Sequence, residues 1–336
     1  MSLPKFISSF GQFIAFQTLI FGSFLWLYYR PAYQYPNYAT TNIKHERLKK
    51  APSPRLIFVG GSNLFFGLDS ELIKAQTEYH PINMGLTVAT RLNFILNEVK
   101  PQLLAGDTVV LVLEYQQFTV PGNAANPQIL ARILEQRPRS IQYLNLEHWK
   151  LLFDKGIQDN AGIALRAAVE NFVARKPILL QSDGYSKYAR RYNQYGDLVM
   201  FRDEKPAQGR HREDLLPNAL NYSVIHKNID TLNKFKEYCN SKHVKVIYSY
   251  PPMPYSQYSK KKLIAKKFDR LFRERLNIPL INSQEDMVFP DEKFIDQTYH
   301  MHSDGPSLQT QKVLDSLYSY KVKDASNFED LKKSNL

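Results

Sequence analysis

Residues 55–69, which read RLIFVGGSNLFFGLD, decide the fold of this chain. Residues 55–59 form a short apolar run with β-branched and aromatic side chains, typical of a buried central strand that ends at the two glycines. From residue 64 to 75, apolar residues recur at helical spacing. Ser62 therefore lies where a strand passes into a helix, a suitable place for a hydroxyl nucleophile whose oxyanion needs stabilisation. The alternative is that Ser62 only caps the helix.

Strands and helices alternate on the rest of the chain. Predicted strands cover residues 80–86, 108–113, 244–250 and 280–282, and predicted helices cover residues 91–104, 224–242 and 307–318. This alternation predicts an α/β fold, a three-layer α/β/α sandwich with a mainly parallel central sheet. Functional residues of such sheets gather at the carboxyl ends of the strands, where Ser62, Gly85 and Glu114 would all fall.

The amino-terminal segment is apolar and uncharged from residue 6 to residue 29. As a helix it would span roughly 36 Å, enough to cross a hydrocarbon core of about 30 Å. A buried core helix is the alternative. The expected domains are a transmembrane anchor (1–30), a tether (31–52), an α/β domain (53–322) with a helical and loop insertion at about 121–217, and a polar tail (323–336). Within the insertion we expect a helix over 126–135, with Asn126 as N-cap and Pro127 as its first helical residue, a helix over 162–174 and a polar loop over 182–212.

The chain is basic, with a formal net charge of +12 and a pI of about 9.4. Such a charge favours acidic partners, but no nucleic-acid-binding motif is present, so we expect no nucleic-acid partner. The basic helix predicted at residues 260–275 either touches an anionic surface or is the solvated face of a packed helix. A single cysteine, Cys239, excludes an internal disulfide and a multi-thiolate zinc site.

A second informative stretch, FIDQTYHMHSDGPSLQTQKVLDSL, covers residues 294–317. A serine hydroxyl needs a base within hydrogen-bond reach, and a carboxylate behind that base fixes the imidazole tautomer. His300 and Asp296, on one loop, can supply this pair. A metal site that uses His300, His302 and an aspartate is an alternative, and either histidine alone can be structural.

Taken together, VGGSN at the first strand, INMGL at the second and FIDQTYHMHSDG before the last helix resemble the SGNH (GDSL-like) hydrolase superfamily. The order Ser, Gly, Asp and His matches it. More narrowly, the chain resembles the membrane-anchored branch that includes the alginate O-acetylation and D-alanyl-lipoteichoic acid transfer proteins. The branch signature D-x-x-Y-H-L-N-x-x-G is matched by Asp296, Tyr299, His300 and Gly305, with Met301 and His302 in place of Leu and Asn.

The resemblance implies roles for individual residues. Ser62 would be the nucleophile, His300 the general base and then acid, and Asp296 its orienting carboxylate. The oxyanion hole would use the N–H groups of Ser62 and Gly85. The third block of the superfamily normally adds an asparagine, but this chain reads LEYQQF there, so Gln116 is the expected substitute. The side chains expected to contact substrate are Asn63, Glu114, Tyr115, Tyr299 and His302.

The implied function is that of a membrane-anchored serine O-acyltransferase or esterase that modifies a cell-envelope glycan or glycolipid through an acyl-Ser62 intermediate. No cofactor and no metal would be needed. Expected partners are an acyl donor, the glycan or glycolipid acceptor, the lipid bilayer and a multi-span membrane O-acyltransferase. The single-pass anchor would hold the catalytic domain outside the cytoplasm, in the periplasm or at the cell surface. The alternative is a non-catalytic SGNH-like glycan-binding or assembly protein with the same membrane partner.

Overall fold

The computed structural model describes residues 3–29, 38, 40–156, 192–199, 214–295 and 298–333. Its helices are α1 (Leu3–Tyr29), α2 (Thr40–Lys50), α3 (Ser62–Gly67), α4 (Ser70–Gln76), α5 (Arg91–Val99), α6 (Gln116–Thr119), α7 (Pro127–Gln136), α8 (Leu146–Leu151), α11 (Tyr222–Ser241), α12 (Tyr255–Arg275) and α13 (Gly305–Lys333). Its strands are β1 (Arg55–Gly60), β2 (His80–Asn83), β3 (Thr108–Val112), β4 (Lys245–Tyr248), β5 (Met253–Pro254) and β6 (Val288–Phe289).

Four strands form the central sheet in the order β2-β1-β3-β4, and every neighbouring pair is parallel. All residues of β1 and β3 are buried, as expected for strands covered on both faces. On the far side of β4, Tyr248 forms a single parallel bridge with Leu280, so the strand predicted at residues 280–282 is reduced to one contact. The prediction of an α/β fold with a mainly parallel sheet is confirmed.

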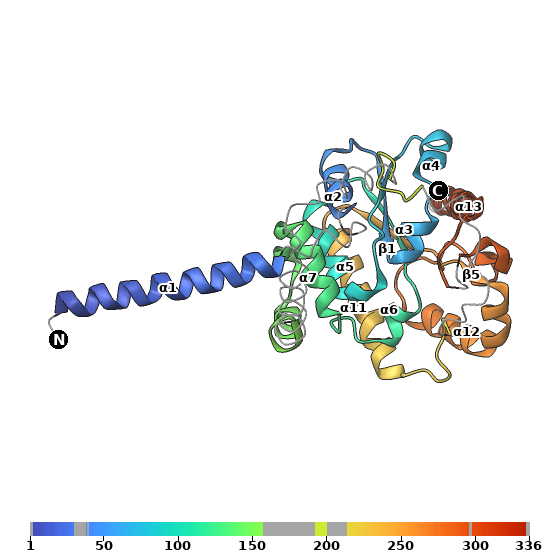
Figure 1. Cartoon of the computed structure of the whole chain (residues 1–336). Coiled ribbons are helices and arrows are strands. Elements are labelled where there is room, and N and C mark those ends of the chain that lie inside the picture. The colour runs from blue at the N-terminus through green and yellow to red at the C-terminus, as the bar shows by residue number, and fades with distance from the viewer. Residues whose placement is uncertain are drawn as a thin grey trace.

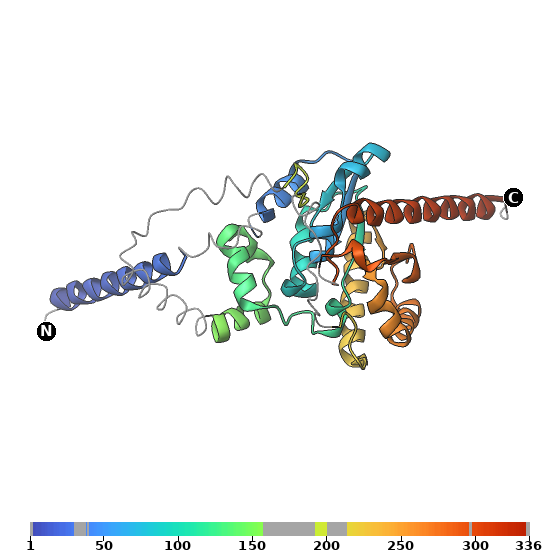
Figure 2. The ribbon, with the colours of Figure 1, turned by 45° about the vertical axis from the view of Figure 1, so that its right-hand side comes forward.

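Helices flank the sheet in two groups. On one side, α3 and α4 contact α13, and on the other, α5 contacts α11, which contacts α12. Figure 1 shows β1 between α5 and α11 on one side and α3 and α13 on the other, and Figure 2 shows α13 extending well past the sheet. The final helix, predicted to end at Tyr318, runs on to Lys333 and takes in most of the expected polar tail.

The helix predicted over residues 64–75 is broken into two. After α3, the backbone is extended at Leu68, and α4 starts at Ser70. Asp69 is the N-cap of α4, because its Oδ1 atom accepts a hydrogen bond from the Leu72 N–H group at 3.1 Å. The apolar spacing is nearly continuous across the break, so this cap, rather than the hydrophobic pattern, sets the boundary.

The folded domain begins earlier than Pro52. Helix α2 packs against it, with Leu48 in the core and Lys44 fully buried. The Lys44 ammonium donates to the backbone carbonyl of Asn83 at 3.0 Å, and burial lowers the pKa of Lys44 to about 8. The expected tether of residues 31–52 is therefore too long at its carboxyl end, because α2 is part of the domain.

Helix α1 presents apolar side chains to its surroundings, among them Phe10, Phe13, Phe16 and Leu19, which are all more than half exposed. Over the residues that the structure describes, no helix combines the length and the apolar character needed to cross a membrane. The anchor expected at residues 1–30 is therefore not supported by the described part of the chain.

The insertion expected at about 121–217 is described in part. Its first helix, α7, begins as predicted: Pro127 is the first helical residue, and the Asn126 side chain accepts a hydrogen bond from the Ile129 N–H group at 3.1 Å. A second helix expected over residues 162–174 lies outside the described residues. The prediction is thus confirmed for α7 only.

Residues 192–199 belong to the loop expected over 182–212, and this part of it is tied to the domain. The buried Asp197 carboxylate accepts hydrogen bonds from the N–H group and the hydroxyl of Ser70 at 2.8 and 2.9 Å. It also accepts one from the side-chain amide of Asn83 at 2.8 Å. The segment therefore packs on the start of α4 and the end of β2.

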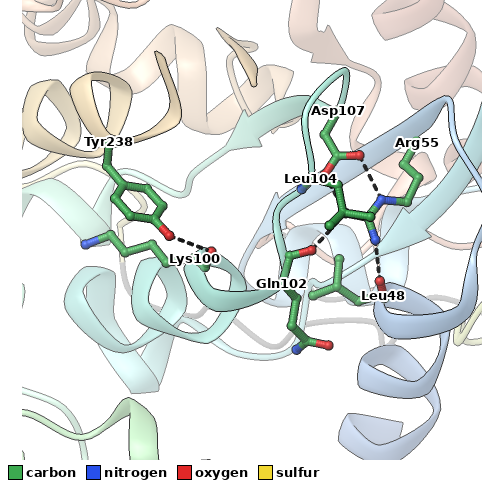
Figure 3. A network of polar contacts seen from close by, with 7 residues as sticks. All are labelled: Leu48, Arg55, Lys100, Gln102, Leu104, Asp107 and Tyr238. Atoms are coloured by element: carbon green, nitrogen blue, oxygen red, sulfur yellow. Dashed lines mark hydrogen bonds and ion pairs between the residues drawn. The ribbon is translucent and has the colours of Figure 1, made fainter. Parts of the chain in front are cut away.

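A buried ion pair joins Arg55, at the start of β1, to Asp107, just before β3 (Figure 3). The guanidinium donates from Nε to Oδ1 at 2.8 Å and from Nη2 to Oδ2, and it also donates to the carbonyls of Leu48 and Gln102. The carboxylate accepts a further bond from the Leu104 N–H group at 2.7 Å. Both charged residues are only 1% exposed, so the pair connects the starts of the two central strands with α2 inside the protein.

Asp107→Ala is expected to lower the free energy of unfolding by about 3–5 kcal/mol, because it leaves the buried Arg55 guanidinium without its carboxylate. Urea denaturation followed by circular dichroism measures the change. The matched control is Glu46→Ala, which breaks the exposed pair with Lys50 on α2 and should not move the denaturation midpoint. Equal destabilisation by both variants would contradict a special role for the buried pair.

Candidate functional site

Ser62 lies at the carboxyl edge of the sheet, directly after β1. The register pairs the last residue of β1 with the last residue of β3, so the two strands end side by side. Ser62 is the first residue of α3, and the N-cap is Gly61. The half-buried Ser62 hydroxyl donates to Glu114 instead of capping the helix. The capping alternative for Ser62 is therefore wrong.

Glu114 follows β3 and turns its carboxylate toward Ser62. The Glu114 Oε1 atom accepts a hydrogen bond from the Ser62 hydroxyl at 3.0 Å and another from the Asn63 N–H group at 2.8 Å. Glu114 is only 1% exposed. Burial raises the pKa of Glu114, while the bond from Asn63, the nearby His300 and the bonds from Ser62 act in the opposite direction. A desolvated proton acceptor therefore lies next to the candidate nucleophile.

Gly61 allows the carboxylate to come this close. A Cβ atom at position 61 would lie 2.7 Å from Glu114 Oε1 and 3.0 Å from the backbone nitrogen of Val88. Asn63 holds the same turn, since its Oδ1 atom accepts from the Gly61 N–H group at 3.1 Å and its Nδ2 atom donates to the Val112 carbonyl at 2.9 Å. The turn is therefore fixed to the end of β3.

Two of the three donors expected to form an oxyanion hole, the N–H groups of Ser62 and Gly85, are engaged within the protein. The N–H group of Gly85 donates to Asn83 Oδ1 at 2.9 Å, which takes it away from an incoming oxyanion. Gln116, expected to replace the third-block asparagine, is the first residue of α6. The residue of the LEYQQF stretch that contacts Ser62 is Glu114. The N–H group of Ser62 lies at the start of α3, and it too interacts with the Glu114 carboxylate.

The five side chains expected to contact substrate are buried: Asn63, Glu114, Tyr115, Tyr299 and His302. The Tyr115 ring packs edge-on against Phe268, and the Tyr299 hydroxyl accepts a hydrogen bond from the Tyr115 N–H group at 3.2 Å. A ring nitrogen of His302 lies 2.9 Å from the Glu292 carbonyl. Four of the five, Asn63, Tyr115, Tyr299 and His302, therefore support the site from inside, whereas Glu114 contacts the Ser62 hydroxyl.

His300 lies close to both α3 and Glu114. Its ring packs on Phe66, with centroids 4.3 Å apart, and its charge interacts with the Glu114 carboxyl group. Phe66 lies four residues after Ser62 in α3, so both project from the same side of that helix. The His300 carbonyl accepts a hydrogen bond from the Ile295 N–H group at 2.8 Å, which fixes the loop. The structure thus brings Ser62, Glu114 and His300 into one neighbourhood.

Asp296, the expected orienting carboxylate, lies outside the described residues, and its role stays a prediction. The metal alternative gains no support: in the part of the chain that the structure describes, no three His, Cys, Asp or Glu side chains are grouped to hold an ion. His302 is held at the backbone carbonyl of Glu292 instead.

Three supporting residues escaped the sequence analysis. Asn83 positions the Gly85 N–H group. The sequence INMG is compatible with this contact, because asparagine side chains often bond the backbone two residues further along the chain. Arg91 opens α5 with a φ of 61°, a sparsely populated conformation for a residue other than glycine. Phe66 matters through its contact with His300. The roles of Arg91 and Phe66 depend on tertiary structure and leave no local signal.

Comparison with known proteins does not place the chain in a family. It matches no family model, and no curated protein matches it either. The SGNH resemblance therefore depends on the short motifs around Ser62, Gly85 and His300 and stays a prediction.

Gly61→Ala is expected to lower the free energy of unfolding by about 1–3 kcal/mol, because the added methyl group overpacks the space that Glu114 and Val88 occupy. Thermal or chemical denaturation measures the loss. Gly11→Ala on α1 is the matched control, since a Cβ atom there meets nothing within 4 Å. A Gly61→Ala protein as stable as the wild type would mean that the carboxylate does not crowd this turn.

Proposed function

We propose that this chain is a serine O-acyltransferase or esterase that modifies a cell-envelope glycan or glycolipid through an acyl-Ser62 intermediate. The observation that carries the proposal is the 3.0 Å hydrogen bond from the Ser62 hydroxyl to Glu114, beside His300. A serine hydroxyl holds almost no alkoxide at neutral pH, so it becomes a nucleophile only next to a proton acceptor. Ser62 has such neighbours at the edge where α/β proteins place their sites.

The strand order supports the SGNH-like architecture in this proposal. The observed order β2-β1-β3-β4, with Leu280 bridging to Tyr248 on the outer side of β4, follows the 2-1-3-4-5 order of flavodoxin-like sheets. The motif residues Ser62, Gly85 and His300 all lie near the carboxyl edge of that sheet or on the loop that packs against it. An SGNH hydrolase would place its nucleophile there.

The proposed chemistry has two half-reactions. In the first, Ser62 Oγ attacks the carbonyl carbon of an acyl ester, its proton passes to a neighbouring base, and the donor alcohol leaves with a proton from His300. The acyl group then remains on Ser62 as an ester. In the second, a sugar hydroxyl or water gives its proton to His300 and attacks that ester, and Ser62 regains its proton as it leaves. No cofactor takes part in either half.

The envelope setting is proposed from the resemblance together with α1. Exposed side chains of α1 include Phe10, Phe13 and Phe16, and a lipid bilayer would remove them from water. The anchor would hold the α/β domain outside the cytoplasm, where it could receive acyl groups from a multi-span membrane O-acyltransferase and pass them to the glycan or glycolipid. The basic charge of the chain favours an acidic acceptor.

A second candidate function is that of a non-catalytic glycan-binding or assembly protein with the same fold. One observation favours it: the Ser62 N–H group interacts with Glu114 and the Gly85 N–H group is bonded to Asn83, so two of the expected oxyanion donors are engaged. Losing one such donor can cost an enzyme about 3–4 kcal/mol in the transition state. Covalent labelling of the serine separates the two candidates.

A fluorophosphonate probe is expected to label the wild-type chain on the peptide that contains Ser62, and Ser62→Ala should abolish the label. Mass spectrometry of the labelled peptide gives the readout. Ser319→Ala, on the exposed face of α13, is the control that should label normally. Wild type that labels no better than Ser62→Ala would favour the non-catalytic candidate.

The full chain is expected to stay in the membrane pellet after an alkaline carbonate wash, because α1 would be embedded in lipid. A variant that lacks residues 1–37 should move to the supernatant with its α/β domain folded, as checked by circular dichroism. Release of the full chain by the wash would contradict the anchor, whatever the outcome at Ser62.

A further inference from the structure

We infer that Glu114, rather than His300, is the group that accepts the Ser62 proton during acylation; the inference rests on the proposed function. The Glu114 Oε1 atom lies 3.0 Å from the Ser62 hydroxyl oxygen, within the reach of about 2.6–3.2 Å that a general base needs. The hydroxyl already donates to this atom. Glu114, in the third block, therefore acts on the nucleophile, whereas an asparagine in this block would donate to the oxyanion.

The surroundings of Glu114 suit a base. Burial raises the pKa of Glu114 above the ordinary value of 4.5, which makes the carboxylate a stronger proton acceptor than an exposed one. Positive charge keeps it from being permanently neutral: His300 and the Arg91 guanidinium both interact with it. The buried Tyr299 hydroxyl also faces it, and the interaction with Glu114 helps to raise the pKa of Tyr299, so that phenol stays neutral.

The hydrogen bonds around the carboxylate explain how charge can move during the reaction. The Asn63 N–H group donates to Glu114 Oε1 at 2.8 Å, and the Ser62 N–H group interacts with the same carboxylate. When Glu114 accepts a proton, it loses its negative charge as the acyl carbonyl oxygen gains one. Both N–H groups then exchange one anionic acceptor for another, so donors that are engaged at rest become available to the oxyanion.

The proton balance closes over the cycle. The proposed cycle starts with Glu114 ionised and a proton on His300. During acylation the Ser62 proton passes to Glu114, the Oγ–C bond forms, the C–O bond to the donor alcohol breaks, and His300 gives that alcohol its proton. During deacylation His300 takes the proton of the attacking sugar hydroxyl or water, and protonated Glu114 returns a proton to Ser62. Each group ends as it began.

Glu114→Gln tests the assignment, because the amide has the same size but cannot accept the proton. Fluorophosphonate labelling should slow by about 10²- to 10⁴-fold, and Glu114→Asp should recover part of the rate. In the wild type, the rate should be full above the Glu114 pKa and fall as the pH drops through it, at a midpoint above 4.5. Glu274→Gln, exposed on α12, is the matched control and should keep both rate and profile.

Two results would overturn the inference while leaving the proposed function intact, given labelling that depends on Ser62. Glu114→Gln could label at the wild-type rate, which would make His300 the proton acceptor. It could also label faster than the wild type, which would mean that the carboxylate blocks the site. If Glu114→Gln fails to fold, His300→Gln decides. The acid limb of the rate profile should persist in that variant, and its disappearance would make His300 the base. A wild type without any label ends both proposals.

Discussion

The register of β1 against β3 is the constraint on which the site depends. The Arg55–Asp107 ion pair crosses between the strands where they begin, and the Ser62–Glu114 hydrogen bond crosses between them just past their ends. Both pairs are separated by the same 52 residues, as are the paired residues of the strands themselves. A slip of one residue would break both contacts and turn every side chain of β1 to the opposite face.

The buried carboxylates of Asp107 and Glu114, before and after β3, have different partners. Asp107 is part of an ion pair inside the protein, whereas Glu114 contacts the candidate nucleophile. Asp107 faces a guanidinium that contacts both of its oxygens, so its charge is neutralised within the protein. Glu114 accepts its closest bonds from a hydroxyl and an N–H group, which offset burial only in part. Burial therefore raises the pKa of Glu114, and its carboxylate is the one that lies beside a hydroxyl whose proton it can accept.

The sequence predicts the parts of the fold that depend on local pattern. The apolar runs that became β1 and β3 are recognisable because strands buried on both faces need continuous apolar side chains. Helix α2 escaped prediction because its sequence, TTNIKHERLKK, is polar, and its burial depends on distant partners such as the Asn83 carbonyl for Lys44. The break before α4 depends on a cap at Asp69 that interrupts an otherwise helical spacing.

The candidate site shows the same division. Ser62 and His300 stand in short motifs whose residue types carry the chemistry, so sequence alone could single them out. The sequence predicts that Glu114 lies near the strand ends, but it does not predict where the side chain points. That direction follows from the strand register and from the space that Gly61 leaves. Its chemistry follows from its type: an ionised carboxylate has no hydrogen to donate, so it can act on Ser62 only as an acceptor. In the proposed reaction, Glu114 would therefore act on the serine proton, where an asparagine would donate to the oxyanion.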